Sequence, residues 1–483
     1  MKSDIVCCVF DIQNRGASMK DITRRNRDEE VKKECPEVEV NDEMLLPSDF
    51  TWMEFLANRI NKKNLVNYVV EKLKSSQEKL KENQILIISA EETAWKVTSS
   101  YCLVRPSLES NQEEADTKMF FIANTLNLNS CLICSTDSDV LFVACLLAPH
   151  LIAKNIYIQY NVASSPPEYV DLCKLFDLMD ADADPLIALA YNQGKNIPQV
   201  FGILHFISGC DYLCHLKGFS KLDCCKAVLQ YLDFIFSRHV EIENLFSISP
   251  EYESERNLFA VKFYCSLYRY KYSACFKQTE TLPALMSNGE VSGPSSLIES
   301  VRRKTWHRTV LDQNTLPTYE ALCFRSQRTT LVLHVAASAL IGVQEVVNVT
   351  DWAWSISEND IPRPILDTEA NMKNVDVLRQ SIMQKCACKK TSCDQTRKYC
   401  KCVNNKRVCS VLCKCVGCNN TKAVQPANED PKSASGSSSC TTLSPGSASS
   451  SSNFEDNLPN DAMFLQVPFA FDNEGYVEDD FDI

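Results

Sequence analysis

The chain has 483 residues, of which 45% are hydrophobic, so it is long enough for two or three domains with sizeable cores. Its net charge of −12 averages over a basic segment and a strongly acidic tail. The apolar part of residues 1–10 is short and interrupted by Asp4, and the longest apolar run, 140–153, is too short to span a bilayer. We therefore expect an intracellular protein with neither a secretory signal nor a membrane partner.

The first half of the chain alternates between short β-branched or aromatic runs and segments with apolar residues at helical spacing. Strands are predicted at 6–10, 84–89, 130–134 and 156–159, and helices at 64–80, 113–126, 139–147, 169–179 and 223–236. This alternation predicts an α/β fold with a mostly parallel sheet flanked by helices. Residues 245–341 are typical of helices, and residues 352–364 are typical of a loop.

The composition changes along the chain and predicts five regions. Residues 421–453 are rich in Ser, Pro and Gly, and are expected to stay disordered because they cannot bury enough apolar surface. The expected regions are an α/β domain at 1–240, a helical extension at 241–345, a linker at 346–384, a cysteine-rich module at 385–420, and a disordered Ser-rich and acidic tail at 421–483.

Acidic residues stand at the ends of predicted strands or at the starts of the helices that follow them. In open parallel sheets such positions meet at one edge, where ligands bind. Carboxylates in one pocket repel each other unless a cation neutralises them, and Mg²⁺ and Mn²⁺ prefer such oxygen ligands. Two such ions, about 3.5–4 Å apart, support phosphodiester cleavage. The candidate catalytic residues are Asp11, Glu114, Asp116, Asp137, Asp139 and Asp211.

The alternative is that these acids only cap helices or lie in solvated loops, since the helix dipole favours acids at helix N-termini in any case. His205 and His215 flank the last acid of the set. Each is expected to pack in the core or to contact phosphate rather than to bind a metal.

Three short motifs match a known group of nucleases. They are NQEEADTKMF at 111–120, STDSDVL at 135–141 and ISGCDYLCHLKG at 207–218. With the strand-borne Asp11, they resemble the core of the flap-endonuclease group of PIN-like 5′-nucleases. The arrangement is also similar to a transposon-associated branch of such proteins. The resemblance covers about residues 5–236 and implies a Mg²⁺- or Mn²⁺-dependent, structure-specific endonuclease that uses the six acids.

The chain departs from the pattern of that family at several places. The family has a further strand with a metal-binding Asp before the position of Asp11, and we expect this strand to be missing here. Ile12 stands where the family has Gly, and Asp116 stands where it has Glu. The turn at 218–221 holds a single Gly, whereas the family has a Gly-rich turn that grips the DNA backbone. A catalytically inactive DNA- or chromatin-binding protein is therefore the alternative to a nuclease.

Nine of the 25 cysteines are concentrated in one short segment. In a reducing compartment such a cluster indicates metal binding rather than disulfides. Each zinc takes four ligands, so three zinc ions need about twelve thiolate contacts, which nine cysteines supply if three of them bridge two ions. The predicted zinc ligands are Cys386, Cys388, Cys393, Cys400, Cys402, Cys409, Cys413, Cys415 and Cys418.

The spacing of these cysteines resembles the tesmin-type CXC domain, a zinc-cluster module that binds DNA. The resemblance implies that Tyr399 enters the minor groove, although packing over the cluster is an equal alternative for this ring. Ten Lys or Arg residues against one acid make residues 385–422 basic enough to meet phosphates. The predicted phosphate contacts are Lys389, Lys390, Arg397, Lys398 and Lys401.

The tail has the opposite charge. Residues 454–483 hold nine acids and no Lys or Arg, mixed with phenylalanines. This composition suits a protein-interaction segment, and simple solubility is the alternative. Taken together, the sequence predicts a nuclear protein that binds DNA through zinc-held residues and carries a nuclease-like domain.

Overall fold

A computed structural model gives the fold, and the chain forms two compact units, Met1–Gln384 and Lys385–Ile483. Both units combine described and undescribed segments. The structure describes residues 5–13, 18–20, 33, 35–44, 48–135, 137–152, 155–160, 168–181, 196–237, 240–287, 293–305, 315–357, 362–371, 373, 400–404 and 409.

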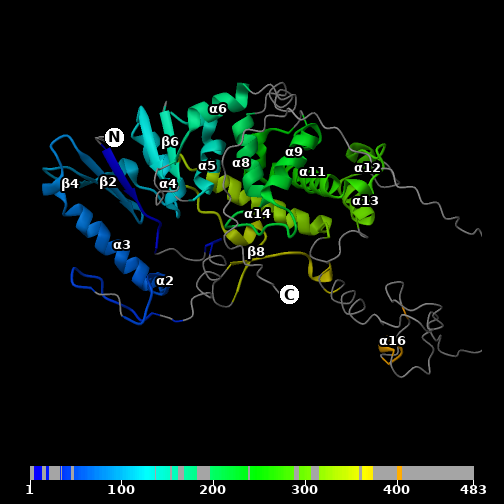
Figure 1. The fold of residues 1–483 in the computed structure, drawn as a ribbon, viewed down its shortest axis with the longest axis horizontal. Coiled ribbons are helices and arrows are strands. Elements are labelled where there is room, and N and C mark those ends of the chain that lie inside the picture. Colours follow the sequence, from blue (N-terminus) through cyan, green and yellow to red (C-terminus); the bar gives the residue numbers. More distant parts are fainter. Residues whose placement is uncertain are drawn as a thin grey trace, which may run out of the picture. The chain divides into compact units, whose positions relative to one another are not determined.

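The first unit begins with a four-stranded mixed sheet. β1 (Ile5–Val9) pairs in parallel with β2 (Ile85–Ala90), and β2 is followed by antiparallel β3 (Thr93–Val97) and β4 (Cys102–Val104). Helix α3 (Arg59–Lys74) lies beside this sheet (Figure 1). Its side chains Val66, Val70 and Leu73 belong to the same hydrophobic cluster as Leu86 and Ile88 of β2. The short helix α2 (Trp52–Ala57) precedes it and starts with a capping box at Thr51.

A second, three-stranded sheet follows. β5 (Ser130–Cys134) pairs in parallel with β6 (Asn155–Tyr160), which pairs antiparallel with β7 (Glu168–Asp171). The predicted helix at 169–179 is therefore wrong in its first residues, because helix α6 (Leu172–Ala181) begins only after β7. The side chain of Asp171 accepts a hydrogen bond from the backbone N of Lys174 at 3.1 Å, which favours a helix start there.

The sheets correct the prediction of a mostly parallel sheet. In the described part of the chain, β1–β2 and β5–β6 are the parallel pairs, and the other pairs are antiparallel. The reason is local: a tight turn, with Glu91 at a φ of 50°, folds β3 back onto β2, and β7 folds back onto β6. The mixed α/β class itself is confirmed.

Three helices lie near the predicted acids, and they are α4 (Ala115–Thr125), α5 (Asp139–Leu147) and α8 (Ile197–Ser208). Two of them, α4 and α5, contain Asp116 and Asp139. Helices α5 and α8 approach closely because Gly202 has no side chain: a Cβ atom there would lie 2.7 Å from Cγ of Leu146. The close packing leaves the N-terminal end of α5 beside the C-terminal end of α8.

The rest of the first unit is mainly helical and shares one hydrophobic core with the second sheet. That core runs from Ile133 and Ile158 in the strands to Phe263 and Leu333 in the helices. The helices are α9 (Lys221–Ile235), α10 (Ile242–Phe246), α11 (Glu253–Lys271), α12 (Leu282–Ser287), α13 (Pro294–Thr305) and α14 (Tyr319–Ala337). Figure 1 shows α9, α11, α12 and α13 on the side of α8 that faces away from the first sheet, and α14 running beneath α5 and α8.

Residues 352–364, predicted as a loop, contain a small hairpin. Its strands are β8 (Trp354–Ile356) and β9 (Pro362–Pro364), and Ala353 before them has a φ of 60°. Among the described helices, none combines the length and the apolar character that crossing a membrane requires.

Candidate metal centres

Asp11 connects the first sheet to the start of α4. Its Oδ1 accepts a hydrogen bond from the backbone N of Ala115, the first residue of that helix, at 2.9 Å. The buried ammonium of Lys118, one turn further on, donates to the backbone oxygen of Glu91 at 2.9 Å. These contacts fix the helix start against the ends of β1 and β2, and with it the position of Glu114.

Lys20 lies among the predicted acids. Its Nζ is 2.8 Å from Oε2 of Glu114, both side chains are about one-tenth exposed, and the ammonium also lies 4.8 Å from the ring centre of Tyr212. Burial lowers the pKa of Lys20, but the ion pair with Glu114 and the charges of Asp211 and Asp116 outweigh it, so the pKa is raised. The ammonium is therefore a permanent positive charge inside the acidic cluster.

Asp116 and Asp137 have perturbed carboxyl groups. Burial, followed by the charge of Asp137, raises the pKa of Asp116 to about 7. Burial, followed by the charge of Asp139, also raises the pKa of Asp137. Ser135 links the two residues, since its hydroxyl lies 3.5 Å from Oδ1 of Asp116 and accepts from the backbone N of Asp137 at 3.1 Å. Negative charge at this place is costly unless a cation is near.

Asp139 differs from its neighbours because it has a histidine partner. Nε2 of His205 lies 2.6 Å from Oδ1 of Asp139, and Nζ of Lys221 lies 3.0 Å from Nδ1 of the same ring. Burial raises the pKa of Asp139, but the hydrogen bond from His205 and the charge of Lys221 outweigh it, so the pKa is lowered. Burial is the largest effect on His205 and, with the charge of Lys221, it lowers the pKa of the ring although the hydrogen bond to Asp139 opposes the shift.

Asp211 lies in a tight turn after α8. Gly209 has a φ of 132°, and a Cβ atom there would lie 2.5 Å from the ring of His215, so only glycine fits. The buried guanidinium of Arg325 on α14 holds the turn, because it donates to the backbone oxygen of Cys214 at 2.7 Å and contacts the hydroxyl of Tyr264. A helix far along the sequence thus positions this acid.

The structure brings the six predicted acids together from four segments of the chain. Burial is the largest cause of the raised pKa of Asp116, and the charges of Asp137, Glu114 and Asp11 raise it further. Burial is also the largest cause for Asp137, whose pKa the charges of Asp139 and Asp211 raise further. Within the described residues, no three of these carboxylates come within 4.8 Å of one another. The cluster is therefore a ring of acids around Lys20 rather than a closed cage.

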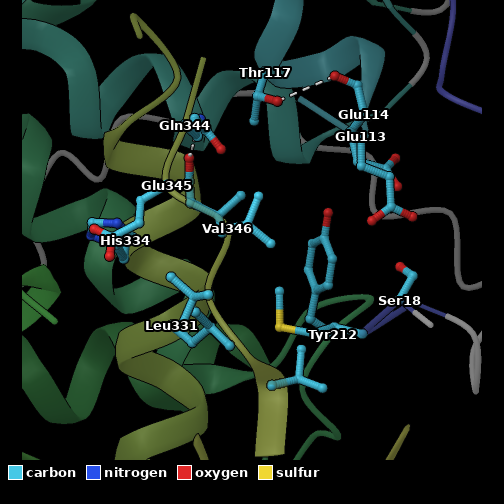
Figure 2. Close-up of a pocket in the computed structure, with 14 residues that line it drawn as sticks. Ser18, Glu113, Glu114, Thr117, Tyr212, Leu331, His334, Gln344, Glu345 and Val346 are labelled. Carbon is cyan, nitrogen blue, oxygen red and sulfur yellow. Dashed lines mark hydrogen bonds between the residues drawn. The ribbon is translucent and has the colours of Figure 1, made fainter. Parts of the chain in front are cut away.

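A cavity of about 150 Å³ adjoins this ring, between α4, α14 and residues 344–349 (Figure 2). Glu113, Glu114 and Tyr212 face it from one side, and Leu331 and Val346 line the other. A smaller pocket next to it shares Glu114 and Tyr212 and also includes Asp116 and Asp139. Glu114, Asp116 and Asp139 therefore line a pocket, and the wall of the adjoining cavity opposite Glu114 mixes apolar Leu331 and Val346 with polar His334, Gln344 and Glu345.

The chemistry of the acidic ring fits a hard divalent cation. Carboxylate oxygens are the ligands that Mg²⁺ and Mn²⁺ prefer. The pKa of Asp116 is raised by burial and then by repulsion from Asp137, and a divalent ion would relieve this repulsion. With Lys20 in place, the ring already holds one positive charge. A divalent ion would be held by the acids whose carboxyl groups Lys20 does not contact directly.

In the second unit, the structure describes residues 400–404 and 409, which include three cysteines. The Sγ atoms of Cys400, Cys402 and Cys409 lie within 4.8 Å of one another, and all three residues are buried. A tetrahedral zinc with Zn–S bonds of about 2.3 Å needs sulfur atoms about 3.8 Å apart, so the three thiols fit one zinc ion. The second of these cysteines, Cys402, lies within the short helix α16 (Lys401–Asn404).

The remaining predictions for this unit fall outside the described residues. For Lys401, the structure describes the backbone helix but not the side chain. The predicted residues that lie outside the description are Cys386, Cys388, Cys393, Cys413, Cys415, Cys418, Tyr399, Lys389, Lys390, Arg397 and Lys398.

Comparison with known families identifies this segment. Residues 383–422 match the family model of the Tesmin/TSO1-like CXC domain, a cysteine-rich domain. The chain carries a CXC domain. Searches of curated proteins and of solved structures found no match to the chain. The CXC match indicates a zinc-binding and DNA-binding role for the second unit, and no comparison supports the nuclease resemblance of residues 5–236.

The sequence analysis missed two residues of the acidic site. Lys20 was not singled out, since a lysine in a loop has no distinctive pattern around it. His205 packs in the core as expected, but its hydrogen bond to Asp139 was not predicted. One signal was available for His205: it stands on the predicted approach to the Gly209–Asp211 turn, next to the proposed acids.

Proposed function

We propose that this chain is a nuclear DNA-binding protein that hydrolyses phosphodiester bonds with Mg²⁺ or Mn²⁺ held by the acidic ring. The observation that carries the proposal is that Glu114, Asp116 and Asp139, from two segments of the chain, line one pocket, where burial and the charge of Asp137 raise the pKa of Asp116 to about 7. Structural acids rarely gather at such an electrostatic cost without a ligand. The motif resemblance to flap endonucleases points to the same chemistry.

The residues divide the work as follows in this proposal. Asp116, Asp137 and Asp139 would hold the cation, which would supply an activated water and stabilise charge on the leaving oxygen. Lys20 places a positive charge beside Glu114, where it could contact a non-bridging phosphate oxygen.

The CXC domain anchors the chain on DNA. We propose that its nine cysteines hold three zinc ions, with three thiolates bridging, and that the basic residues of the module contact phosphates. Tyr399 is proposed to enter the minor groove. The fit of Cys400, Cys402 and Cys409 to one zinc supports the first of these statements.

A second candidate function is a DNA-binding protein with an inactive nuclease fold. Two observations favour it: the ammonium of Lys20 already neutralises part of the ring, and no three of the described carboxylates lie within 4.8 Å. In this case the acids and Lys20 form a structural ion network. The two candidates predict different responses to manganese.

Incubation of the full chain with flap, duplex and single-stranded DNA, with and without Mn²⁺, separates them. We expect Mn²⁺-dependent cleavage that Asp137→Asn lowers by about 100-fold or more, because a metal ligand is lost. Asp177→Asn, an exposed residue on α6, is the matched control and should cleave like the wild type. Absence of cleavage on every substrate, or equal cleavage by Asp137→Asn, overturns the nuclease proposal in favour of the inactive protein.

A further inference from the structure

His205 is enclosed between the acidic ring and the start of α9. Its side chain is 1% exposed, and its ring stacks on Phe142 with 3.8 Å between centroids and 12° between planes. Nε2 faces Asp139 at 2.6 Å. The ammonium of Lys221 lies 3.0 Å from Nδ1 and 3.2 Å from Nε2, so it sits against the ring near both nitrogens.

These contacts determine which nitrogen carries the proton. A carboxylate oxygen accepts only, so we assign the proton to Nε2, which donates to Asp139. The ammonium of Lys221 then lies against the ring, nearest to Nδ1, the nitrogen without a proton. Asp139, His205 and Lys221 come from α5, α8 and α9, so the contacts among their side chains join the three helices.

The same contacts also fix how Asp139 faces the pocket. Oδ1 is engaged by His205, while the backbone N of Asp139 donates to Oδ1 of Asp137 at 2.8 Å. The carboxylate can therefore offer its other oxygen to a cation without rotating. Outer-shell partners of this kind orient metal ligands, and their loss typically weakens metal binding about 10–100-fold.

We propose that His205 is a positioning residue, which orients Asp139 for a divalent cation and keeps the ammonium of Lys221 beside it. This inference rests on the proposed function, because it assigns a role to a neighbour of the acidic ring. Packing alone does not explain the arrangement, since an apolar side chain of similar size would fill the space against Phe142 equally well.

The test measures Mn²⁺ binding to the zinc-loaded full chain by electron paramagnetic resonance of free Mn²⁺. His205→Leu removes the donor, and we expect Mn²⁺ affinity to fall about tenfold or more. His205→Gln places an amide N–H near the position of Nε2, and we expect affinity within about threefold of the wild type. Phe142→Leu removes the stacked ring but keeps the hydrogen bond, so it should bind like the wild type.

If the wild type cleaves DNA, His205→Leu should lower kcat and leave KM for DNA unchanged, because only the orientation of Asp139 is lost. Circular dichroism and thermal melting show that each variant folds. The inference is overturned by wild-type affinity in His205→Leu, or by equal losses in His205→Gln and His205→Leu. Wild-type Mn²⁺ binding that Asp137→Asn leaves intact points instead to failure of the proposed function itself.

Discussion

The two candidate metal centres are assembled in opposite ways. The acidic ring collects residues from 11 to 211, and a hydrophobic core and buried hydrogen bonds bring them together. The described thiols, Cys400, Cys402 and Cys409, lie within ten residues of one another along the chain. The acidic ring depends on the tertiary fold, whereas the described thiols are close together because they are near one another in the sequence.

The two sites therefore differ in whether folding depends on metal binding. The acidic ring keeps its geometry because helices and strands hold it, and Lys20 relieves part of the repulsion in the meantime. The CXC segment has few aliphatic residues, so in zinc modules of this kind the free energy of metal binding is the free energy of folding. Metal removal should therefore affect the two units very differently.

The largest expected effect is on the second unit. Zinc chelation or Cys400→Ser should unfold the CXC domain, since zinc contributes about 10 kcal/mol or more to such modules. Native mass spectrometry should find three zinc ions in the wild type and fewer in the variant. Cys134→Ser, an exposed cysteine of β5, serves as the control and should keep all three. One zinc ion or none in the wild type would contradict the proposed cluster.

Removal of the residues after Gln384 should come next in size. We expect duplex affinity to fall about 100-fold at 0.1 M salt, with a shallower salt dependence, because the basic module releases most of the DNA counterions. Titrations of a labelled duplex at several salt concentrations measure both quantities. Equal affinities and equal salt slopes in the full and truncated chains would mean that the first unit holds the DNA.

Asp116→Asn should stabilise the first unit at high pH. Burial, followed by the charge of Asp137, raises the folded-state pKa of Asp116 from 3.8 to about 7, so the folded state binds this proton more tightly than the unfolded state does. The charged form thus lowers the free energy of unfolding progressively between these two values, and fully above about pH 7.

We therefore expect Asp116→Asn to raise the free energy of unfolding by on the order of 1–3 kcal/mol at pH 8, and by little at pH 4. Urea unfolding at both pH values measures this difference. Asp177→Asn is the matched control on an exposed site and should change neither value appreciably. An equal change at both pH values would refute the electrostatic origin of the effect.

The smallest expected effect concerns the tail. Removal of residues 454–483 should raise duplex affinity about two- to fivefold, because nine tethered acids compete with DNA for the basic module. The same titrations measure it, with the advantage disappearing at high salt. A variant with the nine acids replaced by their amides should behave like the shortened chain, and unchanged affinity in both would exclude this competition.

Sequence patterns predicted elements well where the periodicity was strong. β5 and α5 begin and end where the sequence places them, because a short apolar run followed by a continuous apolar helix leaves few alternatives. The hairpin of β3 and β4 was missed, since Thr93–Val97 is a half-buried strand that mixes Trp95 and Lys96. Pairing direction depends on tight turns such as the one at Glu91, which the composition of a strand does not encode.

For the acidic site, the sequence could identify the acids but not their partners. Asp137 and Asp139 stand in a compact motif that is visible in one line of sequence. Lys20 and His205 acquire their roles only through contacts with residues far away in the chain, at Glu114 and Asp139. Such pairings follow from packing, so they appear only when the chain is folded.

The buried guanidinium of Arg325 has an evolutionary consequence. It donates to a backbone oxygen of the turn that carries Asp211, and Tyr264 donates to the backbone oxygen of Ile207 at 2.9 Å. A recombination event that exchanged the chain beyond residue 240 would leave these carbonyl groups buried without their donors. The CXC unit can be gained, lost or swapped as a cassette, whereas the helical half must be inherited together with the acids that it supports.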